Sequence, residues 1–203
     1  MAGDAQVVNP WLPQPGPPGG TNGKPRQSVH GVTTGLTGPA APQGAGVPRP
    51  ERALPVTRPR PDDGLAWWWL GVHGGAGVST LERAVPGGRD AGRAWPATGG
   101  SEPVVLVARS SAHGLGAAQN AAQQWASRMV TGVDLLGLVV VADAPGRLPR
   151  ILRNQVRLVS GAVPRLWEIP WVEPWRLGET YLPQPPKECV SLARDLNRLT
   201  QLA

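Results

Sequence analysis

The sequence has a single cysteine, Cys189, among its 203 residues, so no disulfide can form within the chain. Its three histidines are scattered and cannot join that cysteine in a Cys/His zinc cluster. No window holds the roughly 18 consecutive apolar residues of a membrane span, and the first residues lack the basic segment and apolar run of a secretory signal. These absences predict a soluble, cytoplasmic protein without a structural metal.

Proline and glycine, in contrast, are abundant, with 24 Pro and 27 Gly in the chain. Residues 1–62 hold 13 of these prolines and 10 of these glycines, and they show no helical or alternating apolar period. Such a segment cannot bury enough apolar surface to offset the entropy of ordering it. We therefore predict a disordered tail over residues 1–62 and one folded domain over residues 63–203, for whose core the 40% hydrophobic content is sufficient.

The tail has two features that suit binding partners. Residues 1–61 carry a net charge of +4 and the rest of the chain carries +2, so a weak, nonspecific nucleic-acid contact is one expectation. Pro10, Trp11 and Leu12 place a large apolar ring among prolines, which suits the groove of a protein partner. The alternative is that Trp11 folds back on the domain.

From Gly64 onward, short apolar runs alternate with amphipathic segments, which is typical of an α/β fold with a parallel sheet. The predicted strands are residues 65–72, 104–108, 135–142 and 165–169, and the predicted helices are residues 112–128, 148–159 and 188–202. The strands are too continuously apolar to have one solvated face. We expect a small, mostly parallel sheet of about four strands flanked by helices, with residues 83–102 too short and glycine-rich for a further strand.

The most specific motif is the glycine-rich run at residues 71–80, which follows a predicted strand and precedes a predicted helix. Glycines allow a tight turn that aims successive N–H groups inward, and a helix start adds a partial positive charge, so the run suits phosphate oxygens. Ser79 would be placed to coordinate magnesium. The candidate phosphate-binding residues are Gly74, Gly75, Ala76, Gly77, Val78, Ser79 and Thr80.

Residues 73–80, HGGAGVST, resemble the deviant Walker A loop of the ParA/MinD partition and division-site ATPases, K-G-G-x-G-K-[ST]-T. The resemblance implies a P-loop-like fold that binds ATP or ADP with magnesium and works as a homodimer. His73 and Val78 replace the two lysines of that pattern. Because the lysine mainly stabilises transferred charge, its loss removes catalysis more surely than binding.

An aspartate at the end of another predicted strand bears on the magnesium site. Asp143 follows the apolar run 138–142 and resembles the D-x-P-x-G edge of a Walker B site. It would bind magnesium through water together with Ser79. The alternative, an Asx-type turn or a cap before the helix at residues 148–159, is equally compatible with the sequence.

A wider resemblance covers most of the predicted domain. Residues 64–180 resemble an uncharacterised actinobacterial family associated with conjugative and integrated mobile elements, through WWWLGVHGGAGVST, VVLVARSSAHGL, GLVVVADAPGRLP and PWVEPWRLGE. This resemblance implies a P-loop-like α/β fold and a link to plasmid transfer or partition. It implies no activity.

Two arginines and two tryptophans are predicted near the same sheet edge as the loop. Arg109 and Arg176 follow predicted strands, and parallel sheets bind ligands beyond the carboxyl ends of their strands, so both would approach an anion there. Trp171 and Trp175 either cover a ligand site, bind a partner, or form a rigid packed loop.

Two other motifs fit poorly. Ser79, His113 and Asp143 could compose a hydrolase triad, but the final glycine of G-x-S-x-G is missing. A dinucleotide fingerprint at residues 71–77 has the wrong glycine spacing. Three hypotheses follow. The first is a non-catalytic adaptor of degenerate P-loop type that binds a nucleotide weakly or not at all. The second is a working ATPase that uses an arginine, Arg109 or one from a second subunit, in place of the lysine, and the third is a DNA-associated accessory protein.

Overall fold

The computed structural model describes residues 35–44, 46–59, 65–97, 99–179 and 182–201. Residues 31–203 form one compact unit, to which everything below refers. The predicted partner motif at Pro10, Trp11 and Leu12 lies outside the described residues and stays a prediction.

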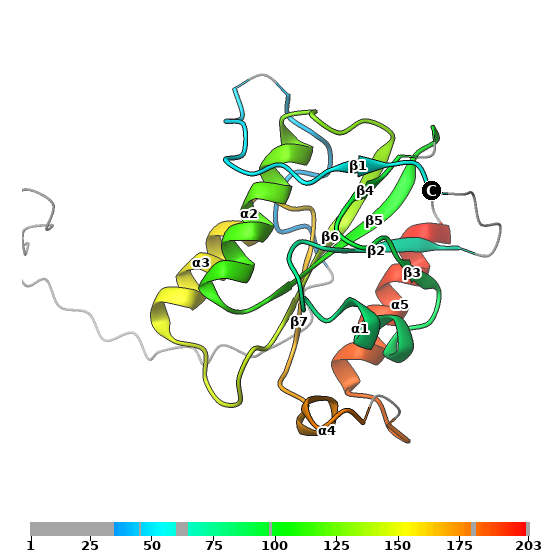
Figure 1. Cartoon of the computed structure of the whole chain (residues 1–203), viewed down its shortest axis with the longest axis vertical. Coiled ribbons are helices and arrows are strands. Elements are labelled where there is room, and N and C mark those ends of the chain that lie inside the picture. The colour runs from blue at the N-terminus through cyan, green and yellow to red at the C-terminus, as the bar shows by residue number, and fades with distance from the viewer. Residues whose placement is uncertain (1–34, 45, 60–64, 98, 180–181, 202–203) are drawn as a thin grey trace, which may run out of the picture. The chain divides into compact units, whose positions relative to one another are not determined.

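The centre of this unit is a five-stranded sheet in the order β3-β2-β5-β6-β7, in which every neighbouring pair is parallel (Figure 1). The strands are β2 (Trp67–Gly71), β3 (Gly88–Asp90), β5 (Glu102–Arg109), β6 (Val133–Val141) and β7 (Leu166–Ile169). The prediction of an α/β fold with a parallel sheet is confirmed. The strand count was too low, because residues 83–102 do hold a strand, β3, which is too short to show an apolar period.

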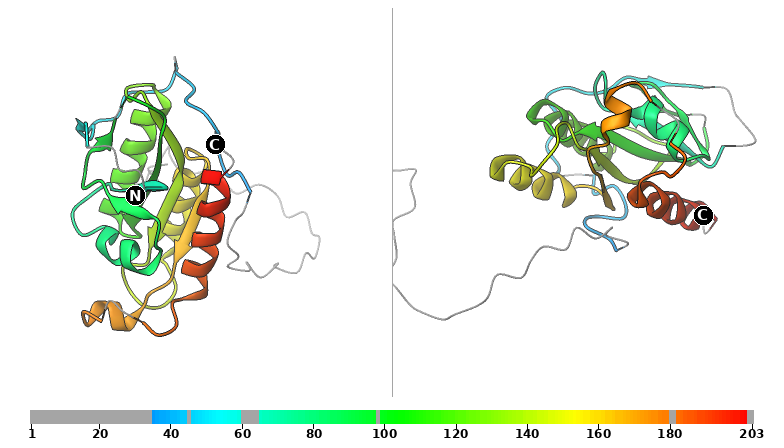
Figure 2. Two further views of the ribbon diagram at one scale, coloured as in Figure 1. Left: turned by 90° about the vertical axis from the view of Figure 1, so that its right-hand side faces the viewer. Right: turned by 90° about the horizontal axis from the view of Figure 1, so that it is seen from below.

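Helices cover both faces of the sheet, with α2 and α3 on one side and α1 and α5 on the other (Figures 1 and 2). The helices are α1 (Val78–Ala84), α2 (Ala112–Ala126), α3 (Arg150–Ser160), α4 (Glu173–Arg176) and α5 (Lys187–Gln201). The stripe of Leu115, Ala118, Ala122 and Trp125 that predicted the first long helix is buried on α2. The spacing of apolar residues along one helical face thus predicted the location of α2 correctly.

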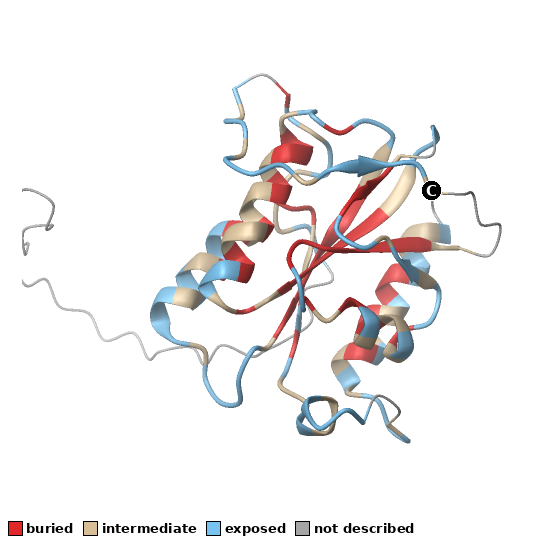
Figure 3. Ribbon diagram, in the orientation of Figure 1, coloured by how far each residue is buried: buried red, intermediate tan, exposed pale blue. Residues whose placement is uncertain are grey.

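The two faces of the sheet have separate cores (Figure 3). Along β2 the side chains alternate between the two cores, so Trp68 packs under α2 while Trp67 and Trp69 pack on the side of α1 and α5. The central strands β2 and β5 are buried on both faces and therefore have continuously apolar stretches. The edge strand β7 differs from the prediction, because its Glu168 is exposed.

Part of the predicted tail contacts this unit. Strand β1 (Val56–Thr57) pairs in parallel with β4 (Trp95–Pro96). The buried side-chain amide of Gln124 on α2 accepts a hydrogen bond from the Leu54 N–H and donates one to the Leu54 carbonyl, each 2.8 Å long. The structure therefore differs from the predicted boundary at residue 62, because a glutamine side chain pairs with backbone in a way that no periodicity reveals.

The strand order defines the place at which a sheet of this kind is expected to bind a ligand. The chain leaves β2 for β3 on one side and then crosses to β5 on the other side of β2. In open parallel sheets, ligands bind at such a reversal point, beyond the carboxyl ends of the strands. The glycine-rich loop after β2 and the turn after β5 meet at this point. No helix within the described residues is long and apolar enough to cross a membrane.

Candidate functional site

The loop between β2 and α1 turns on two glycines in left-handed conformations. Gly75 has φ of 72° and Gly77 has φ of 104°. Gly77 is also the N-cap of α1, and no side chain caps this helix start. A side chain at either position would strain the backbone, so the turn depends on glycine.

The loop leaves a row of backbone donors unused. The N–H groups of Thr80 and Leu81 donate to the Gly77 carbonyl. The N–H groups of residues 74–79 have no hydrogen-bond acceptor within the described part of the chain. Successive free amides in a glycine turn form the concave donor set that anions occupy in proteins. These N–H groups are therefore available to an acceptor, and phosphate binding by residues 74–80 stays a prediction.

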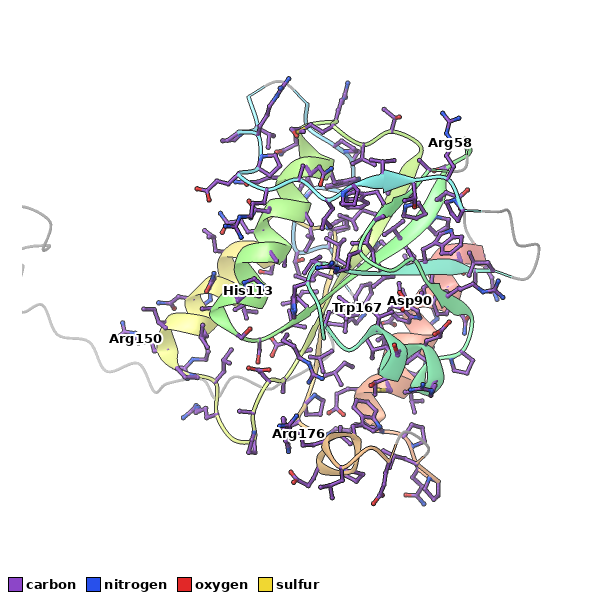
Figure 4. All side chains as sticks on the ribbon, viewed as in Figure 1. Arg58, Asp90, His113, Arg150, Trp167 and Arg176 are labelled. Atoms are coloured by element: carbon purple, nitrogen blue, oxygen red, sulfur yellow. The ribbon has the colours of Figure 1, made fainter. Side chains whose placement is uncertain are left out.

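His73 fixes this loop to the neighbouring strand. Its ring Nδ1 lies 2.8 Å from the Gly74 carbonyl oxygen, and its Nε2 lies 3.0 Å from the backbone nitrogen of Arg109. An amide N–H only donates, so Nε2 accepts and the ring proton is on Nδ1. The His113 ring lies 5.5 Å away, edge to face (Figure 4 labels His113). His73 thus joins the ends of β2 and β5, and a lysine could not accept this bond.

Val78 occupies the position of the second lysine in the deviant Walker A pattern. Its side chain is buried, and its Cγ2 atom lies 3.2 Å from where a Cβ on Gly71 would be. Val78 therefore packs into the core with α1 rather than projecting beside the free amides.

Arg109 lies across the loop instead. Its Nε donates to the Gly75 carbonyl at 3.2 Å and its Nη1 donates to the Ala142 carbonyl at 3.0 Å. Its Nη2 is 3.8 Å from where a Cβ on Gly77 would be. Two of the five guanidinium N–H donors are thus used, and the others have no acceptor among the described residues. Arg109 connects the loop to the end of β6 and retains donors for a ligand.

A pocket of about 100 Å³ opens beside this arginine at the carboxyl ends of β5, β6 and β7. Both predicted anion-contact arginines, Arg109 and Arg176, line it together with Trp171 and Trp175. Arg176 is the last residue of α4 and is labelled in Figure 4. The other lining residues are Gly77, Thr80, Leu81, Val141, Ala142, Pro170 and Val172. The structure therefore brings together residues from the glycine loop and from the tryptophan-rich loop, which lie about a hundred positions apart in sequence.

The chain belongs to a family of unknown function (DUF6668). Residues 65–192 match that family. No curated protein and no solved structure matched the chain. The DUF6668 segment includes β2, the glycine loop, every residue that lines the pocket, and the start of α5. Residues 46–59, with β1 and the Leu54 contact, lie outside it.

The two predicted magnesium ligands, Ser79 and Asp143, lie outside the pocket. Ser79 is exposed on α1, and Asp143 is exposed after β6, with β5 between β6 and the loop strand β2. Neither lines the pocket. The part of the chain that the structure describes has no group of three or more metal-ligating His, Cys, Asp or Glu side chains. Joint magnesium binding by Ser79 and Asp143 stays a prediction.

Two site residues were missed in the sequence. Ser110 is buried, and its hydroxyl accepts a hydrogen bond from the Asp143 N–H at 3.0 Å, which ties the turn after β5 to the turn after β6. The importance of His73 was also missed, because its two partners are backbone atoms. A polar residue directly after an apolar strand was the available signal in both cases.

Proposed function

We propose that this protein is a non-catalytic adaptor whose degenerate, ParA/MinD-like P-loop binds the phosphates of a nucleotide. The carrying observation is the row of unpaired N–H groups at residues 74–79, next to the partly unused guanidinium of Arg109. Backbone amides and arginine donors together are the usual means by which proteins hold phosphate oxygens. A nucleotide would supply those phosphates, with magnesium if Ser79 and Asp143 contribute.

The absence of turnover rests on side chains at the loop. Val78 is directed into the core, and His73 is held by two backbone groups, so neither position provides a cation to the phosphates. Arg109 is the nearest cation, but two carbonyls restrain its guanidinium. In phosphoryl transfer, the main source of rate acceleration is positive charge that stabilises the transferred phosphoryl group in the transition state. We therefore assign this chain a binding role rather than hydrolysis, and the resemblance of residues 64–180 supports placing that role in plasmid or mobile-element transfer or partition.

An adaptor also needs a surface for its partner. The loop after β7 exposes Leu177, at 71% of its surface, close in sequence to Trp171 and Trp175, which line the pocket. Ligand binding under these tryptophans would change what this loop presents. We assign protein recruitment to this loop and to Trp11 of the tail, and homodimer formation is the simplest version of it.

Titration with ATP and ADP, with and without magnesium, tests the proposal, and phosphate release is measured in the same samples. We expect saturable binding without release. The variant Gly77→Ala should weaken binding at least tenfold because it deforms the loop. Gly92→Ala is the matched control, since Gly92 also has a left-handed φ, 68°, with nothing within 4 Å of an added Cβ, and lies outside the pocket. Equal effects of both variants would contradict a binding role for the loop.

Phosphate release that Gly77→Ala abolishes would replace the adaptor by the ATPase hypothesis. Arg109 would then be the residue that takes the place of the lysine, and Arg109→Gln should remove turnover. No nucleotide binding at all would refute the nucleotide-binding role.

A second candidate function, DNA association, is favoured by the surface of α3. Five arginines and no acidic residue lie between positions 147 and 165. Arg150, Arg153 and Arg157 are exposed on α3, and Figure 4 shows Arg150 projecting from the outer side of the helix. Arginines along one helix face suit contacts with successive phosphates of a duplex.

A further inference from the structure

We propose that the pocket between Arg109 and Arg176 is a phosphate-sized subsite, which binds free phosphate or the phosphate end of a small phosphorylated molecule and excludes the nucleoside. This inference rests on the proposed function and specifies which part of a ligand the site holds. Pockets that enclose drug-sized ligands measure roughly 300 to 1,000 Å³. This one measures about 100 Å³, so it encloses a group of a few heavy atoms and leaves the remainder of a ligand outside.

The charge of the lining selects an anion. Two arginines and no acidic residue line the pocket. The acid nearest in sequence, Glu173, accepts a hydrogen bond from the Trp171 indole N–H at 2.6 Å and is not among the lining residues. No partner for the Arg176 guanidinium exists within the described residues. An anion would therefore meet two guanidinium groups without competition from a carboxylate.

The number of unused donors favours phosphate over a carboxylate. Arg109 and Arg176 both retain guanidinium N–H groups, and the Thr80 hydroxyl, also in the lining, makes no hydrogen bond to a described residue. The indole nitrogen of Trp175, another lining residue, also lacks an acceptor, but it is closed to solvent, as are the indole nitrogens of Trp67, Trp69 and Trp125, so it is not counted among the donors of the pocket. Donors from three elements suit a tetrahedral group with several oxygens better than a planar one with two.

The apolar walls increase the strength of these contacts. Leu81, Val141, Pro170, Trp171 and Val172 form most of the remaining lining. Arg109 is half-buried beside them, and attraction between opposite charges is stronger where bulk water is excluded, so Arg109 should hold an anion more strongly than the exposed Arg176 does. Because Trp171, Trp175 and Arg176 all belong to the α4 loop, a bound phosphate would also fasten that loop to Arg109 on β5.

The test is calorimetric titration of the full chain with inorganic phosphate, pyrophosphate, ATP and adenosine. Arg176→Gln is the main variant, because Arg176 is exposed and its loss does not disturb the core. We expect phosphate and pyrophosphate to bind, adenosine not to bind, and Arg176→Gln to weaken phosphate roughly tenfold to 100-fold, the usual effect of losing a charge-assisted contact. Arg194→Gln, an exposed arginine on α5, is the matched control and should bind as the parent does.

The outcomes separate this inference from the proposed function. Nucleotide binding that depends on Gly77 but not on Arg176, with no binding of inorganic phosphate, would overturn the subsite and leave the adaptor. Phosphate binding that depends on Arg176, without ATP binding, would confirm the subsite and overturn the nucleotide role. Adenosine binding would overturn the exclusion of the nucleoside, and no binding of any probe would refute both.

Discussion

At the scale of single residues, His73 shows how a position can depart from the resembling motif and still have a defined role. Its Nε2 is the acceptor for the Arg109 N–H, and its Nδ1 donates to the Gly74 carbonyl. Helix α2 presses against it, since a Cβ on Gly114 would come within 2.9 Å of Nε2. The ring therefore holds the glycine loop and the end of β5 in one arrangement.

Replacing this ring should cost stability. We expect His73→Ala to lower the free energy of unfolding by about 1 to 3 kcal/mol, because the Arg109 N–H loses its acceptor in a largely buried place. Urea unfolding measures the change. His113→Ala is the control, since His113 is exposed and its loss removes only a ring contact. Equal stability of both variants would show that the His73 bridge contributes nothing.

Cys189 provides a probe of the core at the same scale. Burial, and to a lesser extent the nearby Glu188 charge, raises the thiol pKa from 9.0 to about 12. The reactive species is the thiolate, so iodoacetamide at pH 8 should not label the folded protein and should label it fully in denaturant. Rapid labelling without denaturant would contradict the buried position.

The same pKa shift has a consequence for stability against pH. The folded state retains the thiol proton above pH 9.0, where the unfolded thiol begins to lose it. Unfolding then releases a proton, so the free energy of unfolding should fall as the pH rises from 9 toward 12. Cys189→Ala should remove this part of the slope in urea unfolding at a series of pH values.

At the scale of elements, the hydrophobic pattern predicts long elements and misses short ones. The strands β2, β5 and β6 were found because burial on both faces gives them continuously apolar stretches, and the edge strand β7 was found from its apolar residues although its Glu168 is exposed. Strand β3 has three residues and β4 has two, so neither is long enough to show an apolar pattern in the sequence. The four-residue helix α4 was missed for the same reason. Residues of α4 line the pocket. The sequence therefore predicted the arginines and tryptophans of the pocket but not the shape of the pocket.

Helix α3 has a surface whose composition can be tested. Its buried residues are Val156 and Val159, whereas Ile151 and Leu158 are 77% and 62% exposed beside the arginines. Ile151 and Leu158 are seven residues apart, as are Arg150 and Arg157, so each pair lies along one line of the helix surface. Helix α5 also exposes an aliphatic residue, Val190 at 47%, but it contains the acids Glu188 and Asp195, whereas α3 contains no acidic residue.

Charge reversal on α3 tests the DNA hypothesis. If α3 contacts phosphates, the double variant Arg150→Glu, Arg157→Glu should weaken retention of duplex DNA at low salt at least tenfold and reduce the slope of affinity against salt. Arg194→Glu, Arg198→Glu on α5 makes the same change in net charge on another exposed face and is the control. Equal losses from both variants would show that only net charge matters and would remove α3 as a site.

At the scale of the whole molecule, the segment at residues 46–59 extends the unit beyond the DUF6668 match. It is joined to the rest of the unit by the pairing of β1 with β4 and by Gln124, which contacts the Leu54 backbone twice and whose Oε1 also accepts a 3.0 Å hydrogen bond from the Trp95 indole N–H. The composition of the tail predicted no structure here, because two backbone hydrogen bonds to a side chain leave no trace in apolar content. The high proline and glycine content of the segment limits how much apolar surface it buries. It does not decide whether the segment contacts the domain.

This attachment predicts a coupling between one side chain and a distant segment. In the full chain, Gln124→Ala should lower the free energy of unfolding by about 2 to 4 kcal/mol, because the Leu54 N–H and carbonyl and the Trp95 N–H all lose their partner. In a chain that lacks residues 1–59, the same substitution should cost less, since only the Trp95 contact remains to be lost. The difference between the two losses is the coupling energy, measured by urea unfolding of the four proteins.

The neighbouring Gln123→Ala is the matched control, because Gln123 is half-buried and its side chain makes no hydrogen bond to a described residue. It should have the same small effect in both chains. If Gln124→Ala cost equally much with and without residues 1–59, the glutamine would stabilise α2 and β4 alone. The segment would then contact the domain without contributing to its free energy of unfolding. The domain boundary predicted at residue 62 would be correct for stability, although residues 46–59 make contacts with the domain.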